Sequence, residues 1–363
     1  MTTISKIVIT GGPCAGKTTG MSWIQNTFTQ RGYTVLFVPE TATELITGGV
    51  APWTCSSNYE YQKYLMQLQK EKEAVFERAA LSMDAEKILI VLDRGMLDNK
   101  AYMTDQEFED VLDYFGDNEI ELRDHYDAVF HLVTAAKGAE KFYITANNTA
   151  RTETVEEAAA LDDKLISAWT GHPHFRVIDN TSGFEEKMKH LIKEISTFLG
   201  EPEPFEIEKK YLIEYPDIEM LESIPNCEKV EIIQTYLNSS EGEERRIRQR
   251  GSKGNYIYFE TCKIAISGLK RIEIERRLSK DEYLAKLMEA DSLKRPIRKN
   301  RYCLMDGNQY FEIDVYPFWK DRAIMEIELS DPNEKIRFPK IIKVLKEVTQ
   351  DIQYKNSSLA KIK

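Results

Sequence analysis

The stretch Gly11-Gly-Pro-Cys-Ala-Gly-Lys-Thr18 decides the fold of the first half of this chain. It fits the pattern G-x-x-x-x-G-K-[ST] without a mismatch and directly follows an apolar run over residues 4–9. Glycines in such a turn let backbone N–H groups face a ligand where a Cβ would intrude. A helix that opens at Lys17 would add the positive end of its dipole. The stretch therefore predicts a phosphate-binding P-loop.

The P-loop pattern also predicts individual roles. Lys17 would reach the β- and γ-phosphates of a nucleoside triphosphate, and the Thr18 hydroxyl would bind the Mg²⁺ that bridges them. The alternative is a glycine-rich strand-to-helix turn that binds nothing. The predicted nucleotide-binding residues are Gly11, Gly12, Pro13, Cys14, Ala15, Gly16, Lys17, Thr18, Thr19 and Arg151.

Length and composition limit the function classes. A chain of 363 residues exceeds the size of one growing core, so we expect two domains. The formal charge of −11 disfavours binding to nucleic acid. The five cysteines include no C-x-x-C pair, which argues against a disulfide framework or a zinc site. No apolar run approaches the ~18 residues of a membrane span. We expect a soluble cytoplasmic protein, with peripheral membrane contact left open.

The hydrophobic pattern changes near the middle of the chain. Up to residue 200, short apolar runs alternate with helical segments, which predicts an α/β fold with a parallel, doubly wound sheet. The runs cover residues 6–10, 34–39, 88–92, 128–133 and 175–178. The stretch from Gly200 to Pro204 reads as a linker and separates domains at 1–200 and 201–363. Beyond it a period of two predicts an antiparallel β domain, which we expect a helix over residues 339–351 to close.

Charged residues follow two strands of the first domain. Asp93 ends an apolar strand. At this position it either binds the metal ion of the nucleotide or caps the next turn. Arg94 follows it, as in the Asp-Arg pair of nucleoside and nucleotide kinases, and would address a substrate. Glu40 lies at the carboxyl edge of the sheet, where it either orients an acceptor hydroxyl or is a surface glutamate. A polar stretch with Lys137, Lys141 and Arg151 is either a lid over phosphates or a solvated loop.

These residues resemble a known family. The loop from Gly11 to Thr19, the pair Pro39-Glu40 and the run Val177-Ile-Asp-Asn180 are similar to the P-loop ATPase family that includes the kinase domain of the bifunctional nicotinamide-nucleotide regulator. No Asn-Lys-x-Asp motif occurs, so guanine specificity cannot be inferred.

Charged residues alternate along most strands of the second domain. Arg246, Arg248 and Arg250 share one face of a strand, and Glu326 and Glu328 share a face of another, because successive side chains point to opposite faces. For one strand, the charged face would simply be the wet side of a sheet. Seven such segments, each interleaved with apolar residues, favour a closed barrel with a charged interior, in which cations hold phosphates and carboxylates hold metal.

The order Glu-x-Glu-x-Lys, Arg-x-Arg, Lys-x-Arg, Glu-x-Asp and Glu-x-Glu over residues 202–357 resembles the CYTH, or triphosphate tunnel metalloenzyme, superfamily. The resemblance implies Mg²⁺ or Mn²⁺ as cofactor and a water oriented or deprotonated by Glu312 and Asp314. It implies metal ligands at Glu206, Glu208, Glu326 and Glu328. It implies triphosphate contacts at Lys210, Arg246, Arg248, Lys263, Lys299 and Arg301.

The order of a P-loop ATPase and a CYTH domain is similar to the TRPL translocation defect protein 14 family, which implies a nucleotide-binding regulator. Three functions fit this sequence. The first is a nucleotide-binding, kinase-like domain joined to a metal-dependent hydrolase of triphosphate compounds, with Lys17, Asp93 and Arg94 as the reactive set of the first domain. The second is a nucleotide-switched module whose tunnel binds a phosphorylated ligand, such as an anionic lipid headgroup, without turnover. The third is a small-molecule kinase with a nucleoside-like acceptor.

Overall fold

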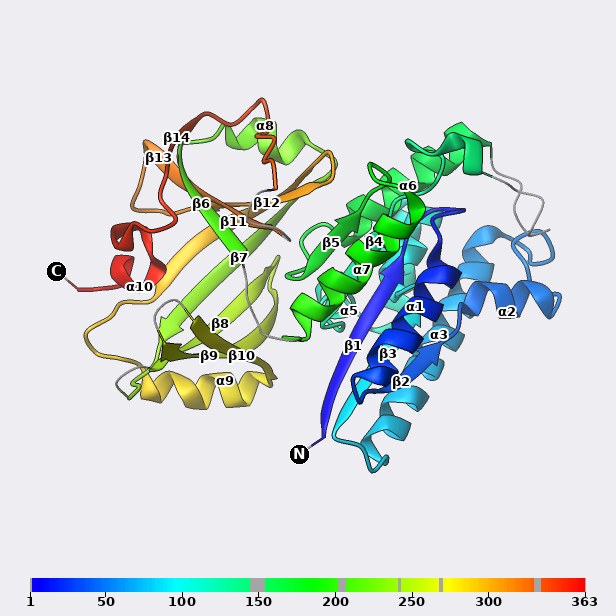
Figure 1. Ribbon diagram of the computed structural model, residues 1–363, viewed down its shortest axis with the longest axis horizontal. Helices are drawn as coiled ribbons and strands as arrows, with labels where there is room; N and C mark the ends of the chain where they lie inside the picture. Colours follow the sequence, from blue (N-terminus) through cyan, green and yellow to red (C-terminus); the bar gives the residue numbers. More distant parts are fainter. Residues whose placement is uncertain are drawn as a thin grey trace. The chain divides into compact units, whose positions relative to one another are not determined.

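The computed structural model describes residues 2–143, 154–201, 207–240, 243–267, 270–329 and 334–362. The chain divides into two compact units, Met1–Ile195 and Ser196–Lys363. Figure 1 shows an α/β unit and a unit built mainly from strands. None of the helices that the structure describes has the length and apolar character needed to cross a membrane.

The first unit contains a parallel sheet with the order β2-β3-β1-β4-β5. Its strands are β1 (Thr3–Thr10), β2 (Thr34–Val38), β3 (Lys87–Asp93), β4 (Ala128–Leu132) and β5 (Phe175–Ile178). The middle five residues of β3 are all buried, as expected for a strand that is covered on both faces. The predicted doubly wound sheet is therefore confirmed, with each strand close to its expected position.

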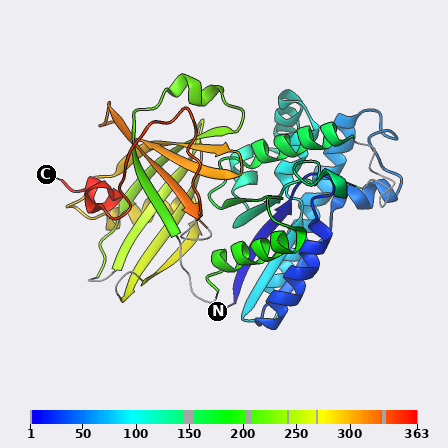
Figure 2. The same ribbon diagram turned by 45° about the horizontal axis from the view of Figure 1, so that its top comes forward.

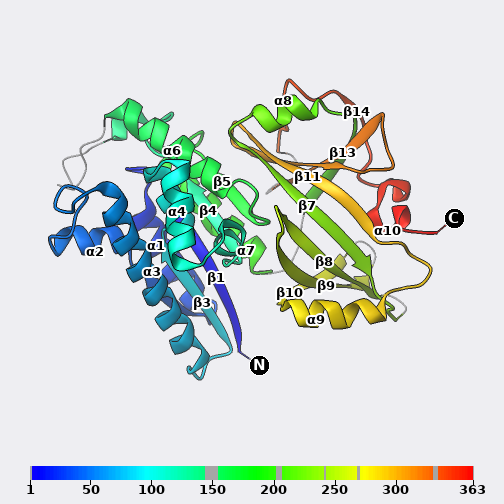
Figure 3. The same cartoon turned by 180° about the vertical axis from the view of Figure 1, so that it is seen from behind.

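Helices cover both faces of this sheet. Figure 1 shows α7 in front of the sheet, and Figure 3, seen from behind, shows α4 in front of it. Two of these helices, α4 and α6, begin at a capping box. In this motif a threonine and the glutamate three residues later each accept a hydrogen bond from the other's backbone N–H group. The helical elements of the unit are α1 (Lys17–Gln30), α2 (Thr41–Thr47), α3 (Asn58–Leu81), η1 (Met96–Tyr102), α4 (Asp105–Phe115), α5 (Glu119–Arg123), η2 (Glu140–Phe142), α6 (Val155–Trp169) and α7 (Phe184–Phe198).

The second unit contains a nine-stranded antiparallel sheet with the order β10-β9-β8-β7-β11-β12-β13-β6-β14. Figure 2 shows its strands curving around an interior. The strands are β6 (Ile207–Glu214), β7 (Cys227–Tyr236), β8 (Glu243–Ser252), β9 (Asn255–Ser267), β10 (Lys270–Leu278), β11 (Ile297–Asp306), β12 (Gln309–Val315), β13 (Arg322–Leu329) and β14 (Val344–Glu347). Short helices connect them at α8 (Ile218–Ser223), α9 (Lys280–Lys286), η3 (Leu287–Glu289), η4 (Ile352–Tyr354) and α10 (Asn356–Leu359).

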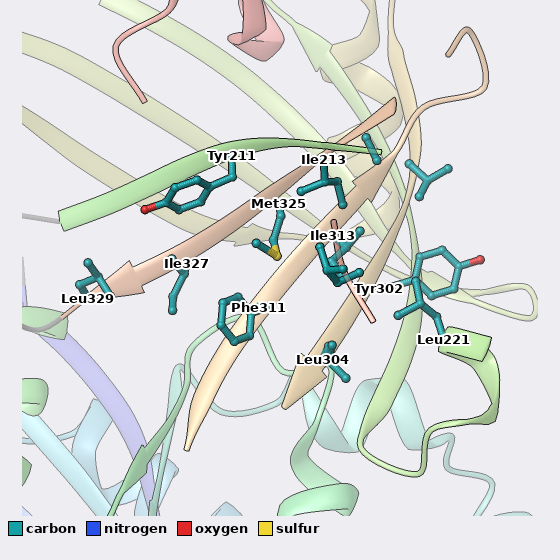
Figure 4. Close-up of a cluster of buried hydrophobic side chains, with 13 residues drawn as sticks. Tyr211, Ile213, Leu221, Tyr302, Leu304, Phe311, Ile313, Met325, Ile327 and Leu329 are labelled. Atoms are coloured by element: carbon teal, nitrogen blue, oxygen red, sulfur yellow. The ribbon is translucent and has the colours of Figure 1, made fainter. Parts of the chain in front are cut away.

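The two faces of this sheet differ in chemistry, as the period of two predicted. One face carries an apolar cluster that includes Tyr211, Phe311, Met325 and Ile327 and that α8 covers with Leu221 (Figure 4). The alternate residues of the same strands carry the charged set on the opposite face. This division buries the apolar side chains and leaves the charged ones to line the interior of the sheet.

The expected helix over residues 339–351 is wrong. Residues Val344–Glu347 form β14, which pairs antiparallel with β6, and the Val348 N–H donates to the Lys210 carbonyl over 2.7 Å. β6 would otherwise be the edge of the sheet and would leave its backbone groups unpaired. Pairing with this edge outweighs the helix-like spacing of the apolar residues in the segment.

Candidate functional site

Backbone conformation in the P-loop depends on its glycines. Gly11 has φ +140° and Gly16, which precedes α1, has φ +91°. A Cβ on Gly11 would lie 2.1 Å from the Leu132 carbonyl oxygen, and one on Gly16 would lie 2.7 Å from Phe184 Cε2. Gly11 therefore excludes a side chain through space as well as through backbone strain, whereas Gly16 is required by its backbone conformation, since the Phe184 ring could move away from a Cβ.

Two buried charged residues from distant segments support the P-loop. Asp162 on α6 accepts hydrogen bonds from the Gly12 N–H at 3.0 Å and from the Thr134 N–H at 3.1 Å. Lys187 on α7 donates to the carbonyls of Ala15 at 3.0 Å and Val133 at 2.6 Å. Burial lowers the pKa of Lys187 to about 8. These residues were missed in the sequence, since neither belongs to a motif that identifies it.

Charged groups gather where β2 and β3 end, beside Lys17. Arg94 Nε donates to Glu40 Oε1 over 2.5 Å, and Arg94 Nη1 lies 3.8 Å from the buried Asp98 carboxylate. Burial would raise the pKa of Glu40, but the charges of Arg94 and Lys17 lower it to about 2. Lys17 Nζ donates to the Gly11 carbonyl over 3.1 Å. Burial and the Arg94 charge lower the pKa of Lys17.

Asp93 lies in the same cluster with an unused acceptor. Its Oδ1 atom is buried and has no hydrogen-bond partner. Burial raises the pKa of Asp93, and the Lys17 charge acts in the opposite direction. A buried carboxylate oxygen without a partner is costly unless a ligand satisfies it. The side chain therefore fits a divalent cation bound next to the P-loop.

In the second unit, electrostatics show how the sheet curls. Burial and the neighbouring Glu326 raise the pKa of Glu208 to about 7, while Lys210 and Lys263 lower it. Glu208 lies on β6 and Lys263 on β9, and five strands separate these two in the sheet order. Their charges interact because the sheet curves until β6 and β9 face the same interior.

A chain of ion pairs lines one wall of this interior. Lys210 Nζ contacts Glu208 at 3.1 Å and Glu326 at 2.5 Å. Arg301 reaches Glu326 on β13 at 2.9 Å and also binds Glu312 and both oxygens of the fully buried Asp314. Lys299 pairs with the same Asp314. Each buried charge on this wall thus has at least one opposite charge beside it, as burial requires.

The β8 strand lines another wall with arginines. Arg248 Nη2 donates to Glu275 over 2.7 Å, but its Nε atom is buried without a hydrogen-bond partner. Burial lowers the pKa of Arg248; Glu275 opposes this change, and the charges of Arg246, Arg250 and Arg301 add to it. Arg248 therefore lies among other arginines as well as beside Glu275.

A model of the AAA domain family matches residues 6–187, half of the chain. The chain belongs to this AAA family. The matched AAA domain contains the P-loop and all of the charged cluster at the ends of β2 and β3. A search of the curated proteins gives no match.

Solved structures resemble part of the chain. The inorganic triphosphatase NE1496 is 26% identical, and the match covers 43% of this chain and 94% of that protein with a TM-score of 0.29. The PH1012 protein from Pyrococcus horikoshii is 18% identical, over 35% of this chain and 81% of that one, with a TM-score of 0.27. The strand pairing itself defines the fold of the second unit.

The structure brings together Lys17, Asp93, Arg94 and Glu40 in the AAA domain. Lys137 is paired elsewhere: its Nζ atom contacts the carboxylates of Asp162 at 3.1 Å and Asp163 at 2.6 Å. Arg151 lies outside the described residues.

In the second unit, the residues brought together in the charged interior include Glu208, Lys210, Lys299, Arg301, Glu312, Asp314 and Glu326. Glu328 lies on the same strand face as Glu326 but is exposed. Glu206 lies outside the described residues. Among the residues that the structure describes, no group of three or more acidic, histidine or cysteine side chains forms a metal site by itself.

Proposed function

We propose that the AAA domain binds a nucleoside triphosphate with Mg²⁺ through residues 11–19. The observation that carries this proposal is the set of groups at the P-loop: the positive φ angles of Gly11 and Gly16, the Lys17 ammonium, and the partnerless oxygen of Asp93. Thr18 and Asp93 would hold the cation, which would neutralise charge on the β- and γ-phosphates. Lys17 would leave the Gly11 carbonyl and bind phosphate oxygens in its place.

For the second unit we propose a triphosphate-binding tunnel of the kind found in the triphosphate tunnel metalloenzymes. The Arg248 side chain supports this function, because its buried Nε atom has no hydrogen-bond partner and other arginines repel its charge. A polyanion would satisfy this atom and relieve the repulsion of Arg248 by Arg246, Arg250 and Arg301. Lys210, Lys263 and Lys299 would add contacts from the other walls.

The same interior would hold a divalent cation beside the triphosphate. Glu208 and Glu326 lie close enough for the Glu326 charge to raise the pKa of Glu208. A hard cation bound to both carboxylates would replace this repulsion by attraction. Glu312 and Asp314 hold Arg301 in place, and their predicted action on an attacking water remains a prediction. The tunnel would then hydrolyse triphosphate compounds.

The test is to incubate the intact protein with tripolyphosphate, ATP and GTP, in the presence of Mg²⁺ or Mn²⁺, and to identify the products. We expect phosphate release from tripolyphosphate, and a much lower rate for Glu208→Gln, whose amide keeps the shape but loses the charge. Arg248→Met is expected to weaken substrate capture. Arg322→Gln serves as control, because Arg322 is exposed and pairs with the adjacent Asp321.

If the wild-type protein binds tripolyphosphate but leaves it intact with either metal, the tunnel is a binding module instead of an enzyme. If it neither binds nor hydrolyses the compound, both forms of the tunnel proposal fail. The nucleotide-binding proposal is independent of either result, since a Lys17→Ala variant tests it separately.

One observation favours a second candidate function, small-molecule phosphorylation in the AAA domain. The hydroxyl of Tyr61, on α3, is buried and has no hydrogen-bond partner. Burial and the Glu40 charge raise the pKa of Tyr61 to about 12. Tyr61, Glu40 and Arg94 could together bind a hydroxyl-bearing acceptor. The protein should then convert ATP and a nucleoside to ADP and a nucleoside phosphate, and Tyr61→Phe should raise the KM for the nucleoside more than that for ATP.

A further inference from the structure

An exposed aromatic ring borders the P-loop. Phe184 begins α7 and is 52% exposed, yet its ring packs against the backbone of Gly16. Phe184 Cε2 and Cζ lie 2.7 and 3.2 Å from the point where a Gly16 Cβ would stand. One part of the ring therefore contacts the loop that would hold phosphates, and the rest faces solvent beside it.

The first turn of α7, which carries the ring, is attached to the loop. Lys187, one turn further along α7, donates to the carbonyl of Ala15 in the P-loop over 3.0 Å. Met188 is fully buried and lies near Gly16 as well. These two contacts join the first turn of α7 to the P-loop, so the Cα of Phe184 lies at a defined place beside a ligand in the loop.

The ring lies on the side of the P-loop where a nucleoside would extend. The groups that act on Lys17, namely Asp93, Arg94 and Glu40, follow β2 and β3, which lie on one side of β1 in the sheet. β4 and β5 lie on the other side, and α7 follows β5. With the terminal phosphate at Lys17, the remainder of the nucleotide would leave the loop toward β5 and α7.

Polar side chains in the segment between β5 and α7 are engaged in hydrogen bonds. Asn180 Nδ2 donates to the carbonyls of Thr134 at 2.8 Å and Lys137 at 2.7 Å, and Asn180 Oδ1 accepts from Lys187 at 2.8 Å. The Thr181 hydroxyl donates to the Asp179 carboxylate over 2.6 Å. Asn180 thus has both polar atoms of its amide in use and does not offer them to the edge of a base.

From these contacts we infer that Phe184 is the stacking platform for the base of the bound nucleotide. This inference rests on the proposed nucleotide-binding function and adds the source of base selectivity. An aromatic face stacks on any base, whereas discrimination between adenine and guanine needs hydrogen bonds to the base edge. The AAA domain therefore binds ATP and GTP with similar affinity, and both affinities depend on the ring.

The test compares ATP, GTP and tripolyphosphate by calorimetry with Mg²⁺ in the full chain. Binding that is lost in the Lys17→Ala variant is assigned to the P-loop, and binding that persists in this variant is assigned to the second unit. We expect Phe184→Ala to weaken ATP and GTP roughly 5- to 150-fold, the range for one base–aromatic stack. Tripolyphosphate has no base, so its affinity for the P-loop should be unchanged. Phe184→Tyr should restore both nucleotide affinities.

Matched controls separate stacking from general damage. Tyr114→Ala removes another exposed aromatic side chain, which lies on α4, and should leave all three affinities unchanged. Thermal unfolding of each variant checks the fold, and Phe184→Leu provides a second variant that keeps an apolar side chain but no aromatic face.

Three results would overturn the stacking role. They are unchanged nucleotide affinity in both Phe184→Ala and Phe184→Leu, an equal loss of tripolyphosphate affinity, or a large preference of the wild-type protein for one purine. An absence of nucleotide binding in the wild-type protein would instead refute the proposed nucleotide-binding function, and the stacking role with it.

Discussion

Asp162 accepts a hydrogen bond from the backbone N–H of Gly12 over 3.0 Å, although 150 residues separate the two in the chain. The same carboxylate receives the Thr134 N–H and contacts His131 Nε2 at 3.0 Å. Burial would raise the pKa of Asp162, but His131 and the hydrogen bonds lower it well below its usual range. The P-loop is thus fixed by an ionised side chain from a distant helix.

This relationship predicts the effect of Asp162→Asn. The asparagine amide keeps the shape of the aspartate but loses its charge. Its NH₂ group cannot accept hydrogen bonds from the N–H groups that Asp162 binds. We expect a loss of roughly 2–4 kcal/mol of unfolding free energy, because a charged hydrogen-bond acceptor is removed from buried donors. Urea denaturation measures this loss. The exposed neighbour variant Asp163→Asn should cost far less, and equal effects would mean that Asp162 does not fix the loop.

The second prediction concerns Lys17→Ala. In the proposed function Lys17 binds phosphates and is not part of the apolar core, so the variant should lose roughly a hundredfold or more in ATP affinity through the missing charged contact. Its thermal unfolding should match that of the wild-type protein. Calorimetry measures the affinity. Normal ATP and GTP binding in a folded Lys17→Ala protein would remove the P-loop from the proposed function.

The third prediction is a pH dependence from Glu73. Burial raises the pKa of Glu73 from 4.5 to about 7, and Tyr126 donates to its carboxylate over 3.0 Å. A carboxyl whose folded pKa is raised adds stability below pH 4.5, and this contribution is lost as the pH rises through 7. We expect the wild-type unfolding free energy to fall by roughly 3 kcal/mol more than that of Glu73→Gln between pH 4.5 and pH 8.

Denaturation with urea at several pH values measures this difference. Glu71→Gln, an exposed change on the same helix, should keep the wild-type dependence. Parallel curves for the wild-type protein and Glu73→Gln would contradict the role of Glu73.

The fourth prediction concerns the ion pairs in the second unit. Asp314→Ala leaves Lys299 and Arg301 buried without the carboxylate that both contact. Breaking a buried pair in this way costs roughly 3–5 kcal/mol. We expect this loss in urea denaturation, and partial recovery with tripolyphosphate, because the polyanion would supply negative charge. Asp321→Asn, in an exposed pair with Arg322, should change stability little. No recovery with tripolyphosphate would count against a phosphate-binding interior.

The fifth prediction is that residues 1–200 and 202–363 fold independently. The two units have separate sheets, and the change from one to the other falls at Ile195 and Ser196, near the end of α7. Each fragment should show a cooperative thermal transition. A failure of both fragments to unfold cooperatively would indicate one shared core.

Much of the fold follows from local patterns. The P-loop motif, the five apolar runs and the change of period near residue 200 predicted the parallel sheet and the antiparallel unit, since these signals depend on residues close together in the chain. The segment over residues 339–351 could not be predicted in this way. Its apolar spacing suits a helix, but the free edge of β6 decides its structure.

The sequence by itself determined the glycine-rich turn before α1 and which strands carry charge, because motif and alternation are properties of neighbouring residues. Tertiary structure alone decided the partners. Lys187 reaches Ala15 across 172 residues, and Arg301 reaches Glu326 past the whole of β12. Such contacts form when distant segments are buried together, since a buried charge must find its opposite wherever the fold supplies one.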